Sequence, residues 1–153
     1  MTVSYKPILL ADDNPQDAEL ALAAMEEQRL AEKVTLCRDG SEVLDYLYRR
    51  GPYAARPEGQ PTVIMLDLKM PKVDGLEVLR AIKSDDMLKR IPVVIFTSSR
   101  EEQDILRCYA FGANAYVVKP VEFGAFRKTV TELGLFWGTI NEPPPPDPAP
   151  AAR

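Results

Sequence analysis

Five short apolar runs alternate along the chain with stretches whose apolar residues recur at helical spacing. The runs are Ile8–Ala11, Val34–Cys37, Val63–Leu66, Val93–Phe96 and Ala115–Val118. Short, unbroken apolar runs bounded by turn signals are typical of strands that are covered on both faces of a sheet. Because a helical pattern follows each run, the chain predicts five strand–helix units and an α/β fold.

The expected helices take their bounds from apolar stripes and from local end signals. They are residues 15–28, a helix with the buried stripe Val43, Leu44, Leu47 and Tyr48, a helix with the stripe Leu76, Val78, Leu79 and Ile82, and residues 101–111 and 121–133. Asn14 before Pro15 suits an N-cap with proline at the first helical position. Asp74 with Glu77 three residues later has the spacing of a capping box. Residues 51–61, rich in proline and glycine, predict an exposed loop.

Polar residues stand at the ends of four predicted strands. Asp12 and Asp13 follow the first strand, Asp67 the third, Thr97 the fourth and Lys119 the fifth. A doubly wound, five-stranded parallel sheet in the flavodoxin-like order 2-1-3-4-5 puts the first strand beside the third, and such sheets bind ligands at the carboxyl ends of their strands. We therefore expect these five side chains to converge at one edge of the sheet.

The converging side chains indicate phosphoryl transfer to a carboxylate. Three carboxylates close together repel one another, and a divalent cation is the simplest relief of that repulsion. Oxygen ligands favour a hard ion, so we expect Mg²⁺ at Asp12, Asp13 and Asp67. Lys119 can neutralise a phosphoryl oxygen and the Thr97 hydroxyl can donate to another. Asp67 would then attack phosphorus and form an acyl phosphate.

Composition excludes several classes of function. The net charge of −4 favours no nucleic-acid partner, and no apolar stretch is long enough to span a membrane or to act as a secretory signal, so we expect a cytoplasmic chain. Histidine is absent, which removes imidazole zinc sites and Ser-His-Asp or Cys-His catalysis. Cys37 and Cys108 lie in apolar patterns and are interpreted as reduced and structural.

The order of these motifs along the chain resembles that of a response-regulator receiver domain of two-component signalling. The acid pair after the first strand, Asp67 followed by MPxxDG, Thr97-Ser98 and Lys119-Pro120 occur in the family's sequence order. The resemblance implies a phosphoacceptor signalling protein rather than an enzyme, which takes its phosphoryl group from a histidine kinase and assists its own phosphorylation and dephosphorylation.

The resemblance also implies roles for single residues. Asp67 is the phosphoacceptor, Asp13 and Asp67 bind Mg²⁺ together with the backbone carbonyl of Lys69, and Asp12 holds a metal-bound water. The Lys119-Pro120 bond is expected to be cis. Thr97 and Tyr116 form the switch pair that transmits phosphorylation to the surface.

A finer resemblance is to the small stand-alone regulators that serve phytochrome-type histidine kinases. It rests on ADDNPQDAEL, RDGSEVLDYL, the long loop before the third strand and the FW-x4-EPPP ending. We accordingly divide the chain into a receiver domain, residues 1–134, and an extension, residues 135–153, with an apolar start and a disordered Pro/Ala-rich tail. With no output domain in the extension, we expect output through protein binding or a change of dimer.

The apolar start of the extension predicts a homodimer. Leu135, Phe136, Trp137 and Ile140 follow the last expected helix, where a monomer has little core left to receive them. If exposed, they would form an apolar patch. We therefore expect a homodimer built on the fourth helix, fifth strand and fifth helix, with Phe136, Trp137 and Ile140 at its interface. Packing of these residues onto their own domain is the alternative.

Three rival functions share part of this pattern. An aspartyl-phosphate hydrolase needs a general acid two residues after the nucleophile, where this chain has Lys69. A flavodoxin-like FMN binder needs a Ser-, Thr- and Gly-rich loop after the first strand, where Asp12 and Asp13 would repel phosphate. A receiver-like interaction module that no longer takes phosphate is the third alternative, and the complete set of acids with Thr97 and Lys119 argues against it.

Overall fold

One parallel five-stranded sheet organises the chain. The computed structural model describes residues 6–30 and 33–145. Its strands are β1 (Ile8–Ala11), β2 (Val34–Cys37), β3 (Val63–Leu66), β4 (Val93–Thr97) and β5 (Ala115–Val118). All neighbouring pairs are parallel, in the order β2-β1-β3-β4-β5. The predicted flavodoxin-like sheet is confirmed, and only β4 differs from its expected bounds, by including Thr97.

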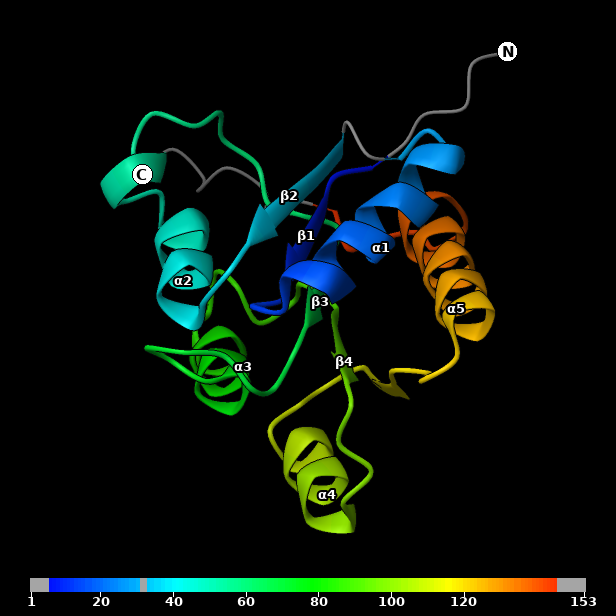
Figure 1. The fold of residues 1–153 in the computed structure, drawn as a ribbon. Coiled ribbons are helices and arrows are strands. Elements are labelled where there is room, and N and C mark those ends of the chain that lie inside the picture. Colours follow the sequence, from blue (N-terminus) through cyan, green and yellow to red (C-terminus); the bar gives the residue numbers. More distant parts are fainter. Residues whose placement is uncertain (1–5, 31–32, 146–153) are drawn as a thin grey trace, which may run out of the picture.

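Helices cover both faces of the sheet (Figure 1). They are α1 (Pro15–Glu27), α2 (Gly40–Tyr48), α3 (Gly75–Ser84), α4 (Glu102–Ala110) and α5 (Phe123–Leu135), with short helical turns η2 (Gly51–Tyr53) and η3 (Phe136–Ile140). One core cluster combines alternate strand residues such as Leu9 and Ile64 with side chains of α2, α3 and α4. The other combines Ile8 and Met65 with side chains of α1 and α5. The central strands β1, β3 and β4 are buried on both faces and apolar throughout, whereas the edge strands β2 and β5 are only partly buried.

The predicted starts of α1 and α3 are confirmed by their caps, whereas α4 and α5 begin at Glu102 and Phe123, one and two residues later than expected. The Asn14 side chain accepts hydrogen bonds from the backbone N–H groups of Gln16 and Asp17, and Pro15 occupies the first turn of α1. Asp74 accepts from the backbone N–H of Glu77 at 2.9 Å. These side chains satisfy donors that the first turn of a helix leaves without partners, so both helices start immediately after a loop of the sheet's carboxyl edge.

The end of α5 differs from the prediction. The helix continues to Leu135 and passes directly into the π-helical turn η3, in which Trp137 packs against the core beneath α1 and α5. Two small residues permit this approach, because a Cβ at Gly134 would lie 3.0 Å from Leu30 and one at Gly138 would lie 3.2 Å from Ile8. The expectation that the domain has little core left for this segment is therefore wrong for Trp137, for which the alternative, packing onto its own domain, holds. Phe136 and Ile140 remain exposed.

Two smaller expectations also need correction. Tyr48 belongs to the predicted buried stripe of α2 but is 41% exposed, and its hydroxyl donates to Asp85 at 2.9 Å. Residues 51–61 are mostly exposed, as predicted, yet Arg56 orders this loop by donating to the Tyr46 carbonyl at 2.6 Å and stacking over the Tyr46 ring. A charged side chain replaces an apolar core as the anchor of the loop.

Three further expectations concern the cysteines, membrane-spanning helices and the C-terminal tail. Cys37 and Cys108 are buried and free, as expected. Within residues 6–30 and 33–145, no helix is long and apolar enough to cross a membrane. The predicted disordered tail falls largely on residues 146–153, which lie outside the described residues.

Candidate functional site

Three carboxylates meet where β1 and β3 end. The two strands are paired so that Ala11 lies beside Leu66, and the residues that follow are Asp12 and Asp67. The N–H of Asp67 donates to the Ala11 carbonyl at 3.0 Å, which extends the pairing into the site. Ligand oxygens of Asp12, Asp13 and Asp67 lie within 4.8 Å of one another. The convergence predicted for these acids is confirmed, and three hard oxygen donors at this spacing fit a Mg²⁺ site.

Lys119 enters the same site from the end of β5. Its ammonium lies 2.7 Å from Asp12 Oδ2 and 2.9 Å from Asp67 Oδ2, and its side chain is buried. The expectation of a cis bond before Pro120 is wrong, because the structure has no cis peptide bond among the described residues. The backbone N–H of Lys119 donates to the Thr97 carbonyl at 2.7 Å, so pairing with β4 positions the lysine without a cis bond.

Asp17 is a fourth acid of the site that the sequence reasoning missed. Its Oδ2 lies 2.9 Å from the Lys119 ammonium, across 102 residues of sequence. Asp17 is the third residue after the N-cap Asn14, in the first turn of α1, and it precedes the buried Ala18. The signal was present, since a residue in that turn next to the buried face of α1 must lie near the end of β1.

Burial changes the acidity of the site. Desolvation raises the pKa of Asp12 from 3.8 to about 6, although Lys119 opposes the change by hydrogen bonding and by its charge. Burial also disfavours the charged form of Lys119, but hydrogen bonds to Asp12 and Asp17 and the charges of Asp67 and Asp12 outweigh it and raise the pKa of the ammonium. The lysine therefore stays charged beside the carboxylates at neutral pH.

A glycine shapes the loop that follows Asp67. A Cβ at Gly75 would lie 2.2 Å from the Asp67 carbonyl oxygen, and the Gly75 N–H donates to the Leu68 carbonyl at 2.8 Å. Only a residue without a side chain permits this approach of two backbone segments. The DG pair of the MPxxDG motif thus caps α3 with Asp74 and lets its first turn, which begins at Gly75, pack behind the acceptor.

Thr97 and Tyr116 are linked through the loop between β4 and α4. Thr97 is buried at the end of β4, and the partly buried Tyr116 donates its hydroxyl hydrogen bond to the Ser99 carbonyl at 2.9 Å. The Ser99 hydroxyl in turn donates to Asp104 on α4 at 2.5 Å. The loop is therefore held between the site and α4, whereas the switching role of Thr97 and Tyr116 stays a prediction.

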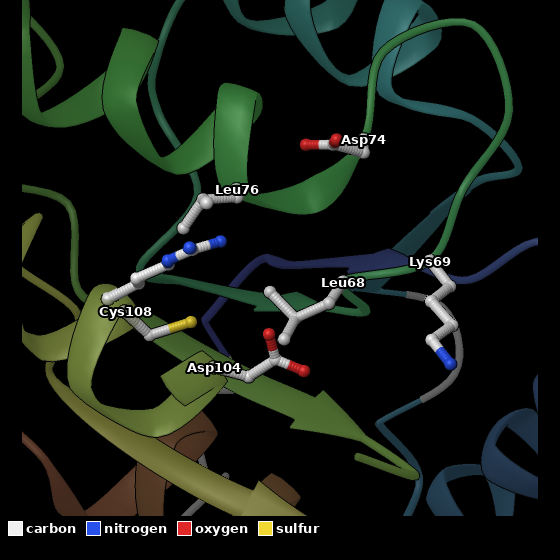
Figure 2. Close-up of a pocket in the computed structure, with 7 residues that line it drawn as sticks. Leu68, Lys69, Asp74, Leu76, Asp104 and Cys108 are labelled. Carbon is white, nitrogen blue, oxygen red and sulfur yellow. The ribbon is translucent and has the colours of Figure 1, made fainter. Parts of the chain in front are cut away.

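A small cavity of about 200 Å³ lies between the loop after β3 and α4 (Figure 2). The residues that line it are Leu68, Lys69, Asp74, Leu76, Asp104, Arg107 and Cys108. In the figure, the Leu68 side chain and the Cys108 thiol point toward the same space, while Lys69 extends away from them. Because ligand pockets commonly measure about 300–1,000 Å³, this cavity gives no support to the FMN-binding alternative.

The fold and the site together define a class of protein. Residues 8–131 match the family model of the response regulator receiver domain, and the chain belongs to this family. Its similarity extends to a methanogenesis regulator and to phytochrome response regulators.

Three relatives illustrate this similarity. The probable methanogenesis regulatory protein FilR2 of Methanothrix harundinacea is 37% identical over 91% of this chain and 88% of its own length. Response regulator Rcp1 of Synechocystis is 36% identical over 86% of this chain and 88% of its own length, and the Mn²⁺-bound form of Rcp1 superposes with a TM-score of 0.85 over 92% of this chain and 99% of that one. The bacteriophytochrome response regulator AtBRR is 58% identical over 90% of this chain and 98% of its own, with a TM-score of 0.71.

Proposed function

We propose that the chain accepts a phosphoryl group on Asp67 from the phosphohistidine of a histidine kinase, in a Mg²⁺-dependent reaction. The observation that carries the proposal is the environment of the Asp67 carboxylate. It lies 2.9 Å from the Lys119 ammonium and shares a 4.8 Å cluster with Asp12 and Asp13. A carboxylate next to both an ammonium and a cation-binding cluster suits a nucleophile that must receive a highly charged group.

The reaction transfers phosphorus from nitrogen to oxygen. One Asp67 oxygen forms a bond to phosphorus as the bond between phosphorus and the kinase imidazole breaks, and the imidazole leaves with the electron pair of that bond. Lys119 is placed to contact a phosphoryl oxygen, and the Thr97 hydroxyl to donate to another. Asp12, Asp13 and Asp67 would hold Mg²⁺, with the Lys69 carbonyl as a further ligand. When bound, the cation supplies positive charge next to the phosphoryl oxygens.

Labelling by a phosphodonor tests this assignment. Asp67→Asn is expected to reduce label from acetyl phosphate or a purified kinase to background, because an amide cannot form the acyl phosphate. Asp74→Asn is the matched control, since Asp74 is exposed and asparagine retains its N-cap. Hydroxylamine-sensitive label of normal intensity in Asp67→Asn would refute the assignment. Chelation of Mg²⁺ should abolish labelling of the unchanged protein.

The kinase is proposed to be of the phytochrome type, acting in the cytoplasm. The supporting observation is that Rcp1 and AtBRR, one of them described as a bacteriophytochrome response regulator, match nearly the whole described chain. Phosphotransfer at short times should be fastest from a phytochrome-type kinase when the host's purified histidine kinases are compared. Faster transfer from another kinase would overturn this partner while leaving Asp67 as the acceptor.

Phosphorylation is proposed to signal through Thr97 and Tyr116. Tyr116 and Thr97 lie on adjacent strands, and the hydrogen bond from Tyr116 to Ser99 connects them to the start of α4. Lys119→Ala should leave Mg²⁺ affinity similar but uncouple phosphorylation from hydrogen exchange in α4 and β5. A normal exchange response in phosphorylated Lys119→Ala would contradict the switch.

A homodimer is proposed to carry the output, with Phe136 and Ile140 at its interface and Trp137 behind them. Ile140 is 69% exposed, and Leu106 and Tyr109 on α4 are also exposed apolar residues. Ile140→Asp should weaken self-association in light scattering at micromolar concentration. Met87→Asp is a matched control, because Met87 is also 69% exposed but lies between α3 and β4. A protein that stays monomeric with and without phosphorylation would refute the dimer.

A further inference from the structure

Lys119 is saturated with carboxylate partners in this structure. Its ammonium has three N–H donors, and three carboxylate oxygens lie within hydrogen-bond distance: Asp12 at 2.7 Å, and Asp17 and Asp67 at 2.9 Å each. The side chain of the lysine is 4% exposed, so water does not compete freely for these donors. A phosphoryl oxygen that binds Lys119 must therefore displace one of the three carboxylates.

The three carboxylates are not equivalent once the site is loaded. Asp12 and Asp67 belong to the cluster whose ligand oxygens lie within 4.8 Å, so a divalent cation there shares their negative charge. Phosphorylation also converts the Asp67 carboxylate into an acyl phosphate. Asp17 stands outside that cluster and is held on α1 rather than at a strand end. It is therefore the carboxylate partner of Lys119 that neither cation binding nor phosphorylation of Asp67 would use.

The position of Asp17 gives it room to compete. Its side chain is 25% exposed, whereas those of Asp12 and Asp67 are 3% and 9% exposed. The Asn14 side chain accepts a hydrogen bond from the backbone N–H of Asp17 at 3.1 Å, so the backbone that carries the carboxylate is held in the first turn of α1. An anionic group that approaches Lys119 thus meets a fixed negative charge on the solvent side of the ammonium.

We propose that Asp17 is a positioning residue that holds Lys119 in the unphosphorylated protein and competes with phosphoryl oxygens for it. This inference rests on the proposed phosphorylation of Asp67. Its consequence is that Asp17 limits loading of the site by small anionic phosphodonors. Removal of its charge should weaken its hold on one Lys119 donor and remove one source of repulsion, because an asparagine at the same place accepts only a neutral hydrogen bond.

The test is the dependence of phosphorylation rate on the concentration of acetyl phosphate at saturating Mg²⁺. Asp17→Asn is expected to lower the half-saturating concentration by about three- to tenfold, with a smaller change in maximal rate, because the lost charge opposes binding of the donor. Asp17→Glu keeps the charge and should behave as the unchanged protein does. The effect of Asp17→Asn should shrink in 0.5 M salt, because the Debye length falls to about 4 Å at that ionic strength and the repulsion between Asp17 and an approaching anion is screened.

Controls separate this role from a structural one. Glu19→Gln removes an exposed acid of the same helix and should change none of these quantities. A second measurement without turnover is the affinity for beryllofluoride with Mg²⁺, which should tighten in Asp17→Asn and not in Asp17→Glu. Thermal unfolding confirms that each variant is folded.

The outcomes are distinct. If the unchanged protein is labelled on Asp67 but Asp17→Asn has the same half-saturating concentration and beryllofluoride affinity, the role of Asp17 is refuted. Equal effects of Asp17→Asn and Asp17→Glu would also refute it, because the charge would not be responsible. Failure to label the unchanged protein would instead refute the proposed function.

Discussion

The carboxyl edge of the sheet and the apolar cluster beneath α1 and α5 are built on the same strands but bury opposite kinds of group. Asp12, Asp67, Thr97 and Lys119 are the buried polar and charged side chains of the described chain, and all lie at that edge. The cluster a few residues away contains Ile8, Leu10, Met65 and Phe96 and no charge. Burial of a charge costs free energy unless it is paired, whereas burial of an apolar side chain stabilises by about 1.5–3 kcal/mol.

One strand can therefore supply apolar side chains to the core along its length and a charged side chain to the site at its end. In β1, Ile8 and Leu10 stabilise the fold. Asp12, one residue past the strand, costs stability at neutral pH because its carboxylate is desolvated, and Lys119 offsets only part of that cost. Removal of a buried charge and truncation of a buried apolar side chain should therefore change stability in opposite directions. Four substitutions, in order of decreasing effect on stability, distinguish the two kinds of site.

Phe96→Ala should destabilise the protein most. Phe96 is 1% exposed, and its ring lies 5.5 Å from that of Phe126, centroid to centroid, at the middle of the cluster. Truncation leaves a cavity and should lower the free energy of unfolding by about 3–5 kcal/mol. Urea unfolding monitored by circular dichroism measures the loss. The exposed Phe123→Ala is the control, and a similar loss in both variants would contradict the central position of Phe96.

Gly75→Ala should damage both stability and the site. The added Cβ would meet the Asp67 carbonyl at 2.2 Å, so the backbone after the acceptor must move. We expect a loss of about 3 kcal/mol in unfolding free energy and a slower rate of labelling on Asp67. Gly59→Ala gives the comparison, because Gly59 has open space around it, although its φ of +114° adds some strain. Unchanged labelling of a folded Gly75→Ala protein would show that the loop can shift without moving Asp67.

Asp12→Asn should stabilise the metal-free protein at neutral pH. The pKa of Asp12 is about 6 in the folded chain against 3.8 ordinarily, so the folded state binds the proton more tightly than the unfolded state does between these values. The contribution of Asp12 to stability is therefore most favourable below pH 3.8 and is lost as pH rises through about 6.

After a discount for the lost bond to Lys119, the gain from Asp12→Asn should be about 1–2 kcal/mol at pH 7 and close to zero at pH 4. Chemical denaturation in EDTA at the two pH values measures the gain. Addition of Mg²⁺ should reduce it, because the cation stabilises the unchanged site more than the variant. A gain that is equal at both pH values would contradict the role of burial.

Gly138→Ala should have the smallest effect. A Cβ at Gly138 would lie 3.2 Å from Ile8 Cδ1 and 3.4 Å from Leu30 Cδ2, both flexible ends of side chains that can shift. Alanine also favours helix over glycine, which offsets part of the crowding. The expected loss is about 1 kcal/mol or less, measured by thermal unfolding. A loss as large as that of Phe96→Ala would mean that η3 belongs to the central core.

The sequence by itself determined the strands, their order and most of the site. Each strand is a short apolar run that ends in a polar residue, and parallel strands carry their carboxyl ends to one edge. For this reason the sequence alone predicts that five polar side chains lie close together at that edge: Asp12, Asp13, Asp67, Thr97 and Lys119. The N-caps Asn14 and Asp74 could also be predicted from the sequence, because an N-cap side chain accepts hydrogen bonds from backbone N–H groups only two or three residues further along the chain.

Contacts between elements that are distant in sequence could not be predicted from the sequence and became evident only in the tertiary structure. Asp17 contacts Lys119 across 102 residues of sequence. This contact depends on how α1 packs against the sheet. Trp137 packs inward because Gly134 and Gly138 let η3 approach Leu30 and Ile8, a fit of shapes that hydrophobic periodicity does not encode. Local patterns specify where an element lies and which face is apolar, whereas the complementarity of two packed surfaces exists only once both are in place.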